Sequence, residues 1–307
     1  MKKILALLMV AAMIFSFAAC KKDDESPADA TAATVKSDEE KDAGKDKAQQ
    51  LAQQQQQQGE AATEVVTSVD SEGNLVTEVI TEPPATDPQG NLLPVTTEEI
   101  VAYFNNAINA AKSDSKSITS NYMKHDVVGE ITGVPSAIDR VLGGTTDFVS
   151  GYMGEDDSKK NVTWSSDDDK NAYFPVEGET WASKLTADDV KEAQFVESDG
   201  MYLIRIKTKD DAAKADVSHG SGHAPKAFNV VLPSIIGDYI PGAVATIFSI
   251  GTVTMEYPSC QVTVKIDPAT GNVVSAEYIM YWTLRIPLGD NTVVLPFSTT
   301  NDYTINW

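Results

Sequence analysis

Two histidines form the best-defined candidate for chemistry in this sequence. His219 and His223 lie four residues apart and are separated by Gly220-Ser221-Gly222, and Asp216 is the nearest third ligand. On a helix, this spacing would place both imidazoles on one face, as in zinc proteases, but those enzymes also need a Glu directly after the first His. The glycines indicate a loop. We therefore expect a polar loop without a metal or other cofactor, and keep His219, His223 and Asp216 as the metal candidates.

Nucleophiles with an activating partner are not evident. Ser113-Asp114-Ser115-Lys116 matches the Ser-x-x-Lys pattern of penicillin-binding enzymes, but no Lys-Thr-Gly follows it. The sequence also has no Gly-x-Ser-x-Gly elbow, phosphate loop or dinucleotide fingerprint. The acidic clusters Asp156-Asp157 and Asp167-Asp168-Asp169 lack the spaced ligands of a calcium loop. We assign no catalytic residue, and expect a domain that is not an enzyme.

The cysteine and tryptophan residues of the folded part are expected to pack in the core, and not to act in catalysis or binding. Cys260 lies in a strand-like run, where we expect a buried and inert thiol. The four tryptophans could line a ligand groove, but we expect core positions for most of them; they are Trp164, Trp181, Trp282 and Trp307.

The first twenty residues have the pattern of an export signal. Lys2 and Lys3 precede sixteen uncharged residues, which are too few for a helix that crosses a bilayer. The segment ends in Phe17-Ala18-Ala19-Cys20, which resembles the lipobox of bacterial lipoproteins, although Phe17 replaces the usual leucine. The resemblance implies cleavage before Cys20 and acylation of its thiol with palmitate-type chains. We expect residues 1–19 to be a lipoprotein signal peptide, and Cys20 to be the lipidation site.

Charge and composition separate a spacer from a folded part. The 307 residues include 45 acidic and 24 basic side chains, for a net charge of −21, which argues against nucleic acid as a partner. Residues 21–95 contain six lysines, sixteen acidic residues, a glutamine run and no aromatic residue. Such a composition buries too little apolar surface to offset the entropy of folding. We expect residues 20–95 to be a disordered, low-complexity linker.

Two similar turns occur in the second half of this spacer. Gly73-Asn74 separates two Val/Thr runs, and Asp87-Pro88-Gln89-Gly90-Asn91-Leu92 repeats the pattern. The first turn suits an isolated hairpin, but a two-stranded hairpin is marginally stable alone in water. We expect an extended stalk here, with the hairpin as the alternative.

Residues 96–307 should form one globular α+β domain. Thr96 and Glu99 make a capping box, and apolar residues at helical spacing predict a helix over 97–113. A second helix should begin at Pro135 and break near Gly143-Gly144, and a short third helix should run from Thr186 to about Ala193. We expect the acidic stretch 154–170 to be a solvated loop.

The rest of the domain predicts strands. Turn residues separate runs over 201–207, 252–257, 261–266, 273–286, 292–297 and 301–307. Tyr278, Met280, Trp282 and Leu284 should share one face of the long strand. Residues 239–255 carry no charge, but Pro241, the glycines and the strand pattern that follows argue against a membrane helix. The predicted fold is a set of N-terminal amphipathic helices packed on an antiparallel meander.

These features resemble Gram-positive cell-surface lipoproteins over residues 1–95. The helix-then-sheet order is also similar in outline to lipid-carrying lipoproteins whose curved sheet wraps an apolar cavity, although fold alone does not carry function. We expect a monomer on the extracellular face of the membrane that binds an apolar ligand or a cell-wall component without catalysis. The alternatives are an envelope hydrolase acting on wall polymer or glycan, and a structural or adhesive wall protein.

Overall fold

The computed structural model describes two compact units, which are treated separately below. The described residues are 63–69, 75–81, 85–88, 90, 92–136, 139, 144–150, 153–233 and 250–307. The described residues of the first unit lie within Lys21–Leu93, and those of the second lie within Pro94–Trp307. Among the described residues, no helix has the length and apolar character needed to span a membrane.

The smaller unit contains a β-hairpin. Strands β1 (Thr63–Val69) and β2 (Leu75–Thr81) pair antiparallel, with Thr63 opposite Thr81 and Val69 opposite Leu75. This is the hairpin that the sequence allows as an alternative to an extended stalk. The second turn also forms, because Gly90 N donates to Asp87 O at 2.9 Å.

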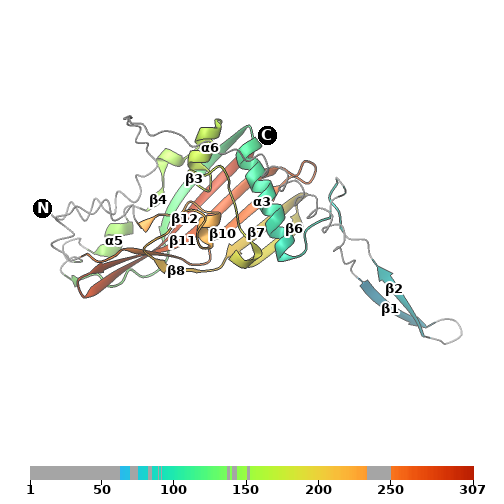
Figure 1. Cartoon of the computed structure of the whole chain (residues 1–307), viewed down its shortest axis with the longest axis horizontal. Coiled ribbons are helices and arrows are strands. Elements are labelled where there is room, and N and C mark those ends of the chain that lie inside the picture. Colours follow the sequence, from blue (N-terminus) through green and yellow to red (C-terminus); the bar gives the residue numbers. More distant parts are fainter. Residues whose placement is uncertain are drawn as a thin grey trace, which may run out of the picture. The chain divides into compact units, whose positions relative to one another are not determined.

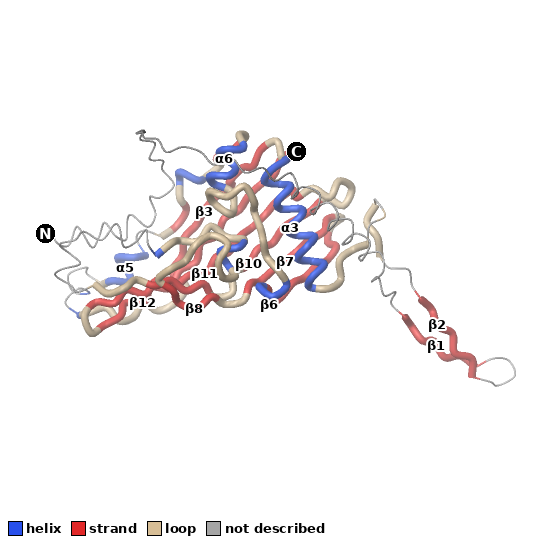
Figure 2. The backbone as a smooth tube through the Cα atoms, in the orientation of Figure 1, coloured by secondary structure: helices blue, strands red, loops and turns tan. Residues whose placement is uncertain are grey.

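The larger unit is mostly antiparallel β-sheet with few helices (Figures 1 and 2). The helices are α3 (Thr97–Asp114), α5 (Thr145–Ser150), α6 (Asp167–Tyr173) and the short 3-10 helices η1 (Asp157–Lys159), η2 (Ala187–Asp189) and η3 (Ala224–Lys226). The strands are β3 (Ser117–Val127), β4 (Gly154–Glu155), β5 (Val162–Trp164), β6 (Val190–Ser198), β7 (Met201–Thr208), β8 (Asp211–Lys214), β9 (Thr254–Tyr257), β10 (Gln261–Ile266), β11 (Val273–Leu288) and β12 (Asn291–Asn306).

The capping box predicted for the first helix is confirmed. Thr96 Oγ1 accepts from Glu99 N at 3.2 Å, and the Glu99 carboxylate accepts from Thr96 N at 3.0 Å. These backbone bonds lower the pKa of Glu99. The apolar side of α3 is buried, including Phe104 and Ile108, which are fully inaccessible to solvent.

Ten strands form one sheet. Seven of them follow each other in the order β4-β3-β12-β11-β10-β7-β6. Strands β5, β8 and β9 extend it: β5 pairs with β3, β9 pairs with β11, and β8 pairs with β9. The long strands β11 and β12 pair along their whole length, and β12 also pairs with β3. The last strand of the chain therefore lies inside the sheet, next to a strand that precedes it by more than 160 residues.

The two faces of the sheet have different surroundings. On the inner face, Tyr278, Met280, Trp282 and Leu284 of β11 are at most 3% exposed, as the alternation predicts. Aromatic side chains from the covering segments pack there, with the rings of Phe174 and Phe228 within 6.3 Å of the Tyr278 ring. On the outer face, the intervening β11 side chains are half-buried.

Three predictions about the elements are wrong. The helix expected from Thr186 to Ala193 is a three-residue 3-10 helix followed by β6, because the chain from Val190 onward pairs with β7. The last two predicted strands are one continuous strand, β12, whose pairing with β11 continues through residues 298–300. The acidic stretch 154–170 forms β4, η1, β5 and the start of α6, and it contains the buried Lys159 and Lys170.

Two other predictions fall partly outside the described residues. Of the helix predicted to begin at Pro135, only Pro135, Ser136 and Asp139 are described before Gly144, where the backbone turns with φ +110° ahead of α5. Residues 234–249, most of the uncharged segment, also lie outside the described part of the chain.

Candidate functional site

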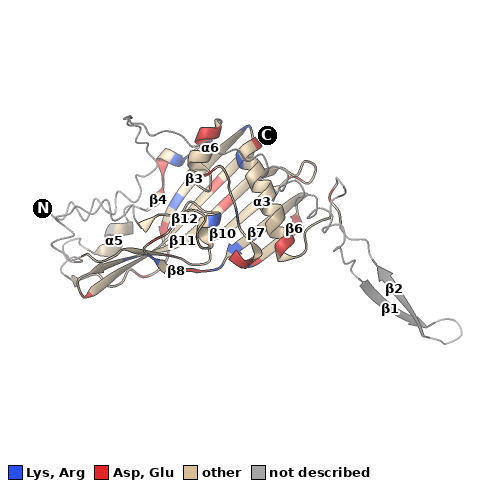
Figure 3. Cartoon of the chain, in the orientation of Figure 1, with Lys and Arg blue, Asp and Glu red and all other residues tan. Residues whose placement is uncertain are grey.

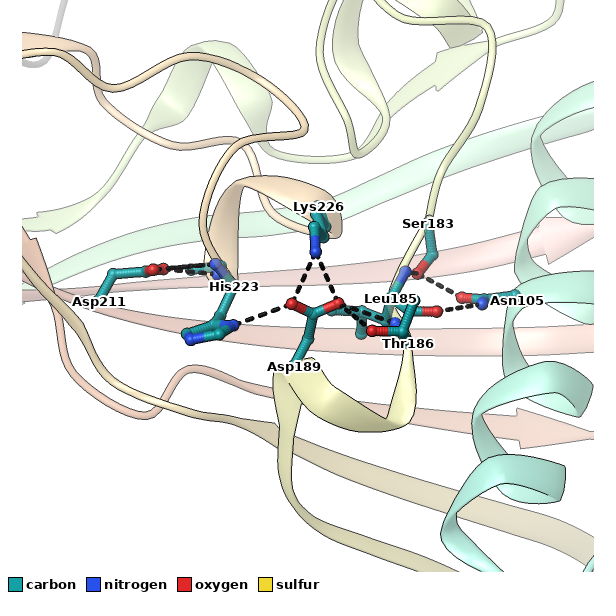
Figure 4. Close-up of polar contacts among 9 residues, drawn as sticks. Asn105, Ser183, Leu185, Thr186, Asp189, Asp211, His223 and Lys226 are labelled. Atoms are coloured by element: carbon teal, nitrogen blue, oxygen red, sulfur yellow. Dashed lines mark hydrogen bonds and ion pairs between the residues drawn. The ribbon is translucent and has the colours of Figure 1, made fainter.

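A buried carboxylate organises the main polar cluster of the domain (Figure 4). Asp189 is 3% exposed and lies at the end of η2, where β6 begins. Lys226 Nζ donates to both of its carboxylate oxygens, at 2.7 and 2.8 Å, and His223 Nδ1 donates to Oδ1 at 2.9 Å. The backbone N–H and the hydroxyl of Thr186 complete the set at 2.9 and 2.8 Å. Five hydrogen bonds from four donor atoms therefore converge on one carboxylate.

The electrostatics of Asp189 follow from these donors. Burial by itself would raise its pKa, but the hydrogen bonds from Lys226, His223 and Thr186 lower it to about 2. Asp189 is therefore ionised at any physiological pH, and it attaches the loop that carries His223 and Lys226 to the start of β6.

A second carboxylate holds the same loop. Asp211 on β8 accepts from His223 N at 2.9 and 3.0 Å and from Ala224 N at 2.8 Å, at the start of η3. Gly222 lies directly against it, because a Cβ at this position would come within 2.6 Å of the Asp211 carboxylate. Only glycine, with its φ of +80°, leaves room for this carboxylate to cap η3.

The pairing of Asp189 with His223 resembles part of a catalytic triad, in which a carboxylate orients an imidazole that activates a nucleophile. The remaining requirement is a hydroxyl or thiol hydrogen-bonded to the other imidazole nitrogen. Among the described residues, no such group bonds to His223, and the hydroxyl of nearby Ser221 donates to Ser218 O at 2.7 Å. As described, the cluster can orient an imidazole and hold a loop, but it does not assemble a nucleophile.

Two buried lysines hold the C-terminal end of α3. Lys112 is 1% exposed, and its ammonium donates to the carbonyls of Phe174, Val176 and Trp181 at 3.0, 2.8 and 3.4 Å. Burial lowers the pKa of Lys112 to about 7, although Glu179 and Glu177 act in the opposite direction. Lys170 is 2% exposed and donates to the carbonyl of Ser115 at 2.9 Å.

Two asparagines connect the same helix to the segment before Asp189. Asn105 Nδ2 donates to Leu185 O at 2.7 Å, and Ser183 Oγ donates to Asn105 Oδ1 at 2.6 Å. Asn109 Oδ1 accepts from Ala182 N and its Nδ2 donates to Ser183 O, at 2.6 and 2.9 Å. Helix α3 and the Asp189 cluster are therefore joined by a continuous set of hydrogen bonds.

The outer face of the sheet carries a row of polar side chains. Successive strand registers place six residues side by side across β6, β7, β10, β11, β12 and β3: Gln194, Arg205, Thr263, Glu277, Asp302 and Tyr122. We call this set the outer row. Figure 3 shows basic and acidic residues interspersed along these strands.

The centre of the outer row is electrostatically unusual. Glu277 and Asp302 lie directly opposite each other on β11 and β12, a like-charge arrangement that costs stability. Asp302 Oδ1 accepts from Asn121 Nδ2 at 2.5 Å. Partial burial and the charges of Asp302 and Glu277 raise the pKa of the adjacent Tyr122. Two half-buried carboxylates and a phenol therefore lie side by side on the outer face of the sheet.

The metal candidates do not come together. His223 bonds to Asp189, the Nδ1 atom of His219 is buried without a hydrogen-bond partner in the described structure, and Asp216 is exposed. Across the described ranges, no group of three His, Cys, Asp or Glu side chains could hold a metal ion. The lipidation site Cys20 lies outside the described residues.

The other candidates are packed into the structure. Cys260 is fully buried, and burial raises the pKa of its thiol, which donates to Tyr281 O. Trp164 and Trp282 are core residues, Trp181 is half-buried beneath Lys184, and Trp307 is 41% exposed. The Ser113 hydroxyl donates to Asn109 O within its own helix.

Sequence reasoning missed the residues that organise the site. Asp189 and Lys112 lie within the helices predicted over Thr186 to Ala193 and over 97–113, and no motif in the sequence marks either residue as functional. No family model, curated protein or solved structure matches this chain.

Proposed function

We propose that this protein is a lipid-anchored lipoprotein of the outer cell surface, and that its folded domain binds a cell-wall component without catalysis. The signal-like residues before Cys20 support the location. The residues between Cys20 and the domain would act as a spacer, and the predicted amphipathic helices would hold the sheet in shape.

The observation that carries the binding role is the outer row. Its two facing carboxylates accept hydrogen bonds, and the neighbouring Tyr122 offers an aromatic face, which together suit a hydroxyl-rich polymer. A partner that donates to Glu277 and Asp302 would also relieve their mutual repulsion. By contrast, the five hydrogen bonds to Asp189 leave that carboxylate fully engaged within the fold.

Binding is tested by co-sedimentation of the chain from Lys21 to Trp307 with isolated cell walls. We expect Glu277→Gln and Tyr122→Ala each to weaken binding about tenfold, the loss of one or two good polar or stacking contacts. Because it removes a like-charge contact, Glu277→Gln should leave the melting temperature equal or higher. Asp290→Asn, in the exposed β11–β12 turn, is the control and should bind as the wild type does.

Two outcomes contradict this role. Equal wall binding by all variants would remove the outer row from the function. A lipid that co-purifies with the domain in native mass spectrometry, without any wall binding, would favour an apolar carrier.

The anchor is tested by replacing Cys20. Cys20→Ala should abolish metabolic labelling with a palmitate analogue and release the protein from the membrane fraction. Membrane attachment that persists in the variant would contradict the lipid anchor.

A further inference from the structure

The two edges of the large sheet differ in the length and the pairing of their last strands. Beyond β3 the edge is closed by β4 and β5, which have two and three residues. At the other end, β6 is nine residues long and pairs only with β7. Within the described residues, no backbone hydrogen bond reaches the outer edge of β6 at residues 191–198. Short edge strands prevent pairing with other chains, whereas a long free edge invites it.

The side chains of β6 are also unusual for a protected edge. Its β-bulge is confined to the start of the strand at Lys191, the strand has no proline, and Val196 is 47% exposed. On the inner face, Phe195 is half-buried and contacts the rings of Tyr103 and Tyr202, with centroid distances of 6.0 and 5.0 Å. This aromatic group ends at the edge, so one side of it is left without a neighbouring strand.

The sequence of β6 is complementary to itself in one antiparallel register. With a twofold axis at Gln194, Ala193 lies opposite Phe195 of the second copy, and Lys191, the extra residue of a β-bulge against β7, lies near its Glu197. Lys191 and Glu197 are both exposed, and neither has an ion-pair partner in the described structure. The register therefore brings opposite charges near each other at two places and forms two pairs of a large side chain against a small one.

We propose that two copies of this chain associate through β6, in this antiparallel register, to form one continuous sheet. The inference does not depend on the proposed function, but it would place two outer rows end to end, because Gln194 is the last residue of each row. The net charge of −21 opposes association, so the dimer should strengthen as salt screens the repulsion between copies.

The first test is a cross-link at the twofold axis. In the chain from Lys21 to Trp307, which contains every described residue, Gln194→Cys places two thiols on directly opposed residues. Opposed Cα atoms in an antiparallel pair are about 4.5–5.5 Å apart, a distance that suits a disulfide. Cys260 is buried and should not react. Mild oxidation should give a disulfide-linked dimer.

The matched control is Ser198→Cys, on the same exposed edge. In the proposed register, the two copies of residue 198 are about 26 Å apart, so no disulfide should form. We expect about tenfold more linked dimer from Gln194→Cys than from Ser198→Cys. Equal cross-linking of the two variants would overturn the register.

The second test reverses the charges. Lys191→Glu and Glu197→Lys should each raise the dimer dissociation constant about tenfold, because each variant creates two like-charge pairs. The double variant should return to within about threefold of the wild type. Asp290→Lys changes the net charge as much as Glu197→Lys does, and should not weaken association. Wild-type protein that stays monomeric in sedimentation equilibrium, or a dimer that none of these variants weakens, would overturn the proposal.

Discussion

Two lysines of the domain, the half-buried Lys226 and the buried Lys112, are held by different means. Lys226 meets a carboxylate, Asp189, and the pair shares further donors from His223 and Thr186. Lys112 is surrounded by carbonyl groups, and no described carboxylate lies within salt-bridge distance of it. The hydrogen bonds from Lys226, His223 and Thr186 lower the pKa of Asp189 to about 2, whereas burial among carbonyl groups lowers the pKa of Lys112 to about 7. An opposite charge keeps a group ionised when it is removed from water. Carbonyl dipoles alone satisfy its hydrogen bonds, but they do not offset much of the free-energy cost of desolvating the charge.

The largest effect should come from removing the counter-ion. Asp189→Asn leaves the ammonium of Lys226 and the imidazole of His223 without their anion. We expect the free energy of unfolding to fall by about 3–5 kcal/mol, measured by urea denaturation. The neighbouring Asp188 is exposed, so Asp188→Asn is the matched control and should change stability by less than about 0.5 kcal/mol. Similar losses in both variants would show that the cluster is not a stabilising unit.

Next in size is the pH dependence that Lys112 creates. Between its folded pKa of about 7 and its ordinary value of 10.5, the unfolded chain holds a proton that the folded chain lacks. Stability should therefore rise with pH in this window, by about 3 kcal/mol over two pH units. Lys112→Met should remove this rise, while Lys116→Met, at an exposed position, should keep it. A Lys112→Met variant with the same pH slope as the wild type would contradict a lowered pKa.

A smaller effect is expected in acid. The pKa of Asp189 is lowered from 3.8 to about 2, so its contribution is complete above pH 4 and is lost as the pH falls toward 2. The stability difference between the wild type and Asp189→Asn should shrink by about 2 kcal/mol over that range. The free energy of unfolding of both proteins is measured at each pH by denaturation monitored with circular dichroism. A stability difference that does not change with pH would mean that the pKa of Asp189 is not lowered.

The smallest effect should come from an exposed ion pair. Lys207 Nζ lies 3.0 Å from the Glu192 carboxylate, and both side chains are more than one third exposed. Lys207→Met should change the free energy of unfolding by less than about 1 kcal/mol, and 1 M salt should abolish the difference. A larger loss of stability would mean that the exposed pair of Lys207 and Glu192 contributes as much as the pair of Lys226 and Asp189.

Local sequence signals predicted part of the fold. The capping box at Thr96 and Glu99, the alternation in β11 and the turn at Asp267–Gly271 are determined by neighbouring residues. Strand β3 was missed because its polar and charged residues acquire their burial only by pairing with β12, more than 160 positions away. The helix expected after Thr186 was wrong because tertiary pairing with β7 outweighs helix propensity there.

The candidate site was less predictable than the fold. Asp189 and Lys226 are 37 residues apart, and Lys112 meets carbonyls 62–69 residues away. Nothing in the spacing of these residues indicates a shared environment. His223 was identified, but as a metal ligand paired with His219, and its structural partner is a carboxylate.

The position of β12 inside the sheet has a consequence for biosynthesis. Its neighbours β3 and β11 are both made before it, and until residues 291–306 emerge from the ribosome, each of these two strands has an open side. Nascent chains that stop at Asp290 should therefore be digested by a protease that spares the chain ending at Trp307. The time at which the domain folds would then be set by the synthesis of its last strand, the sixteen-residue β12, and not by the earlier synthesis of α3.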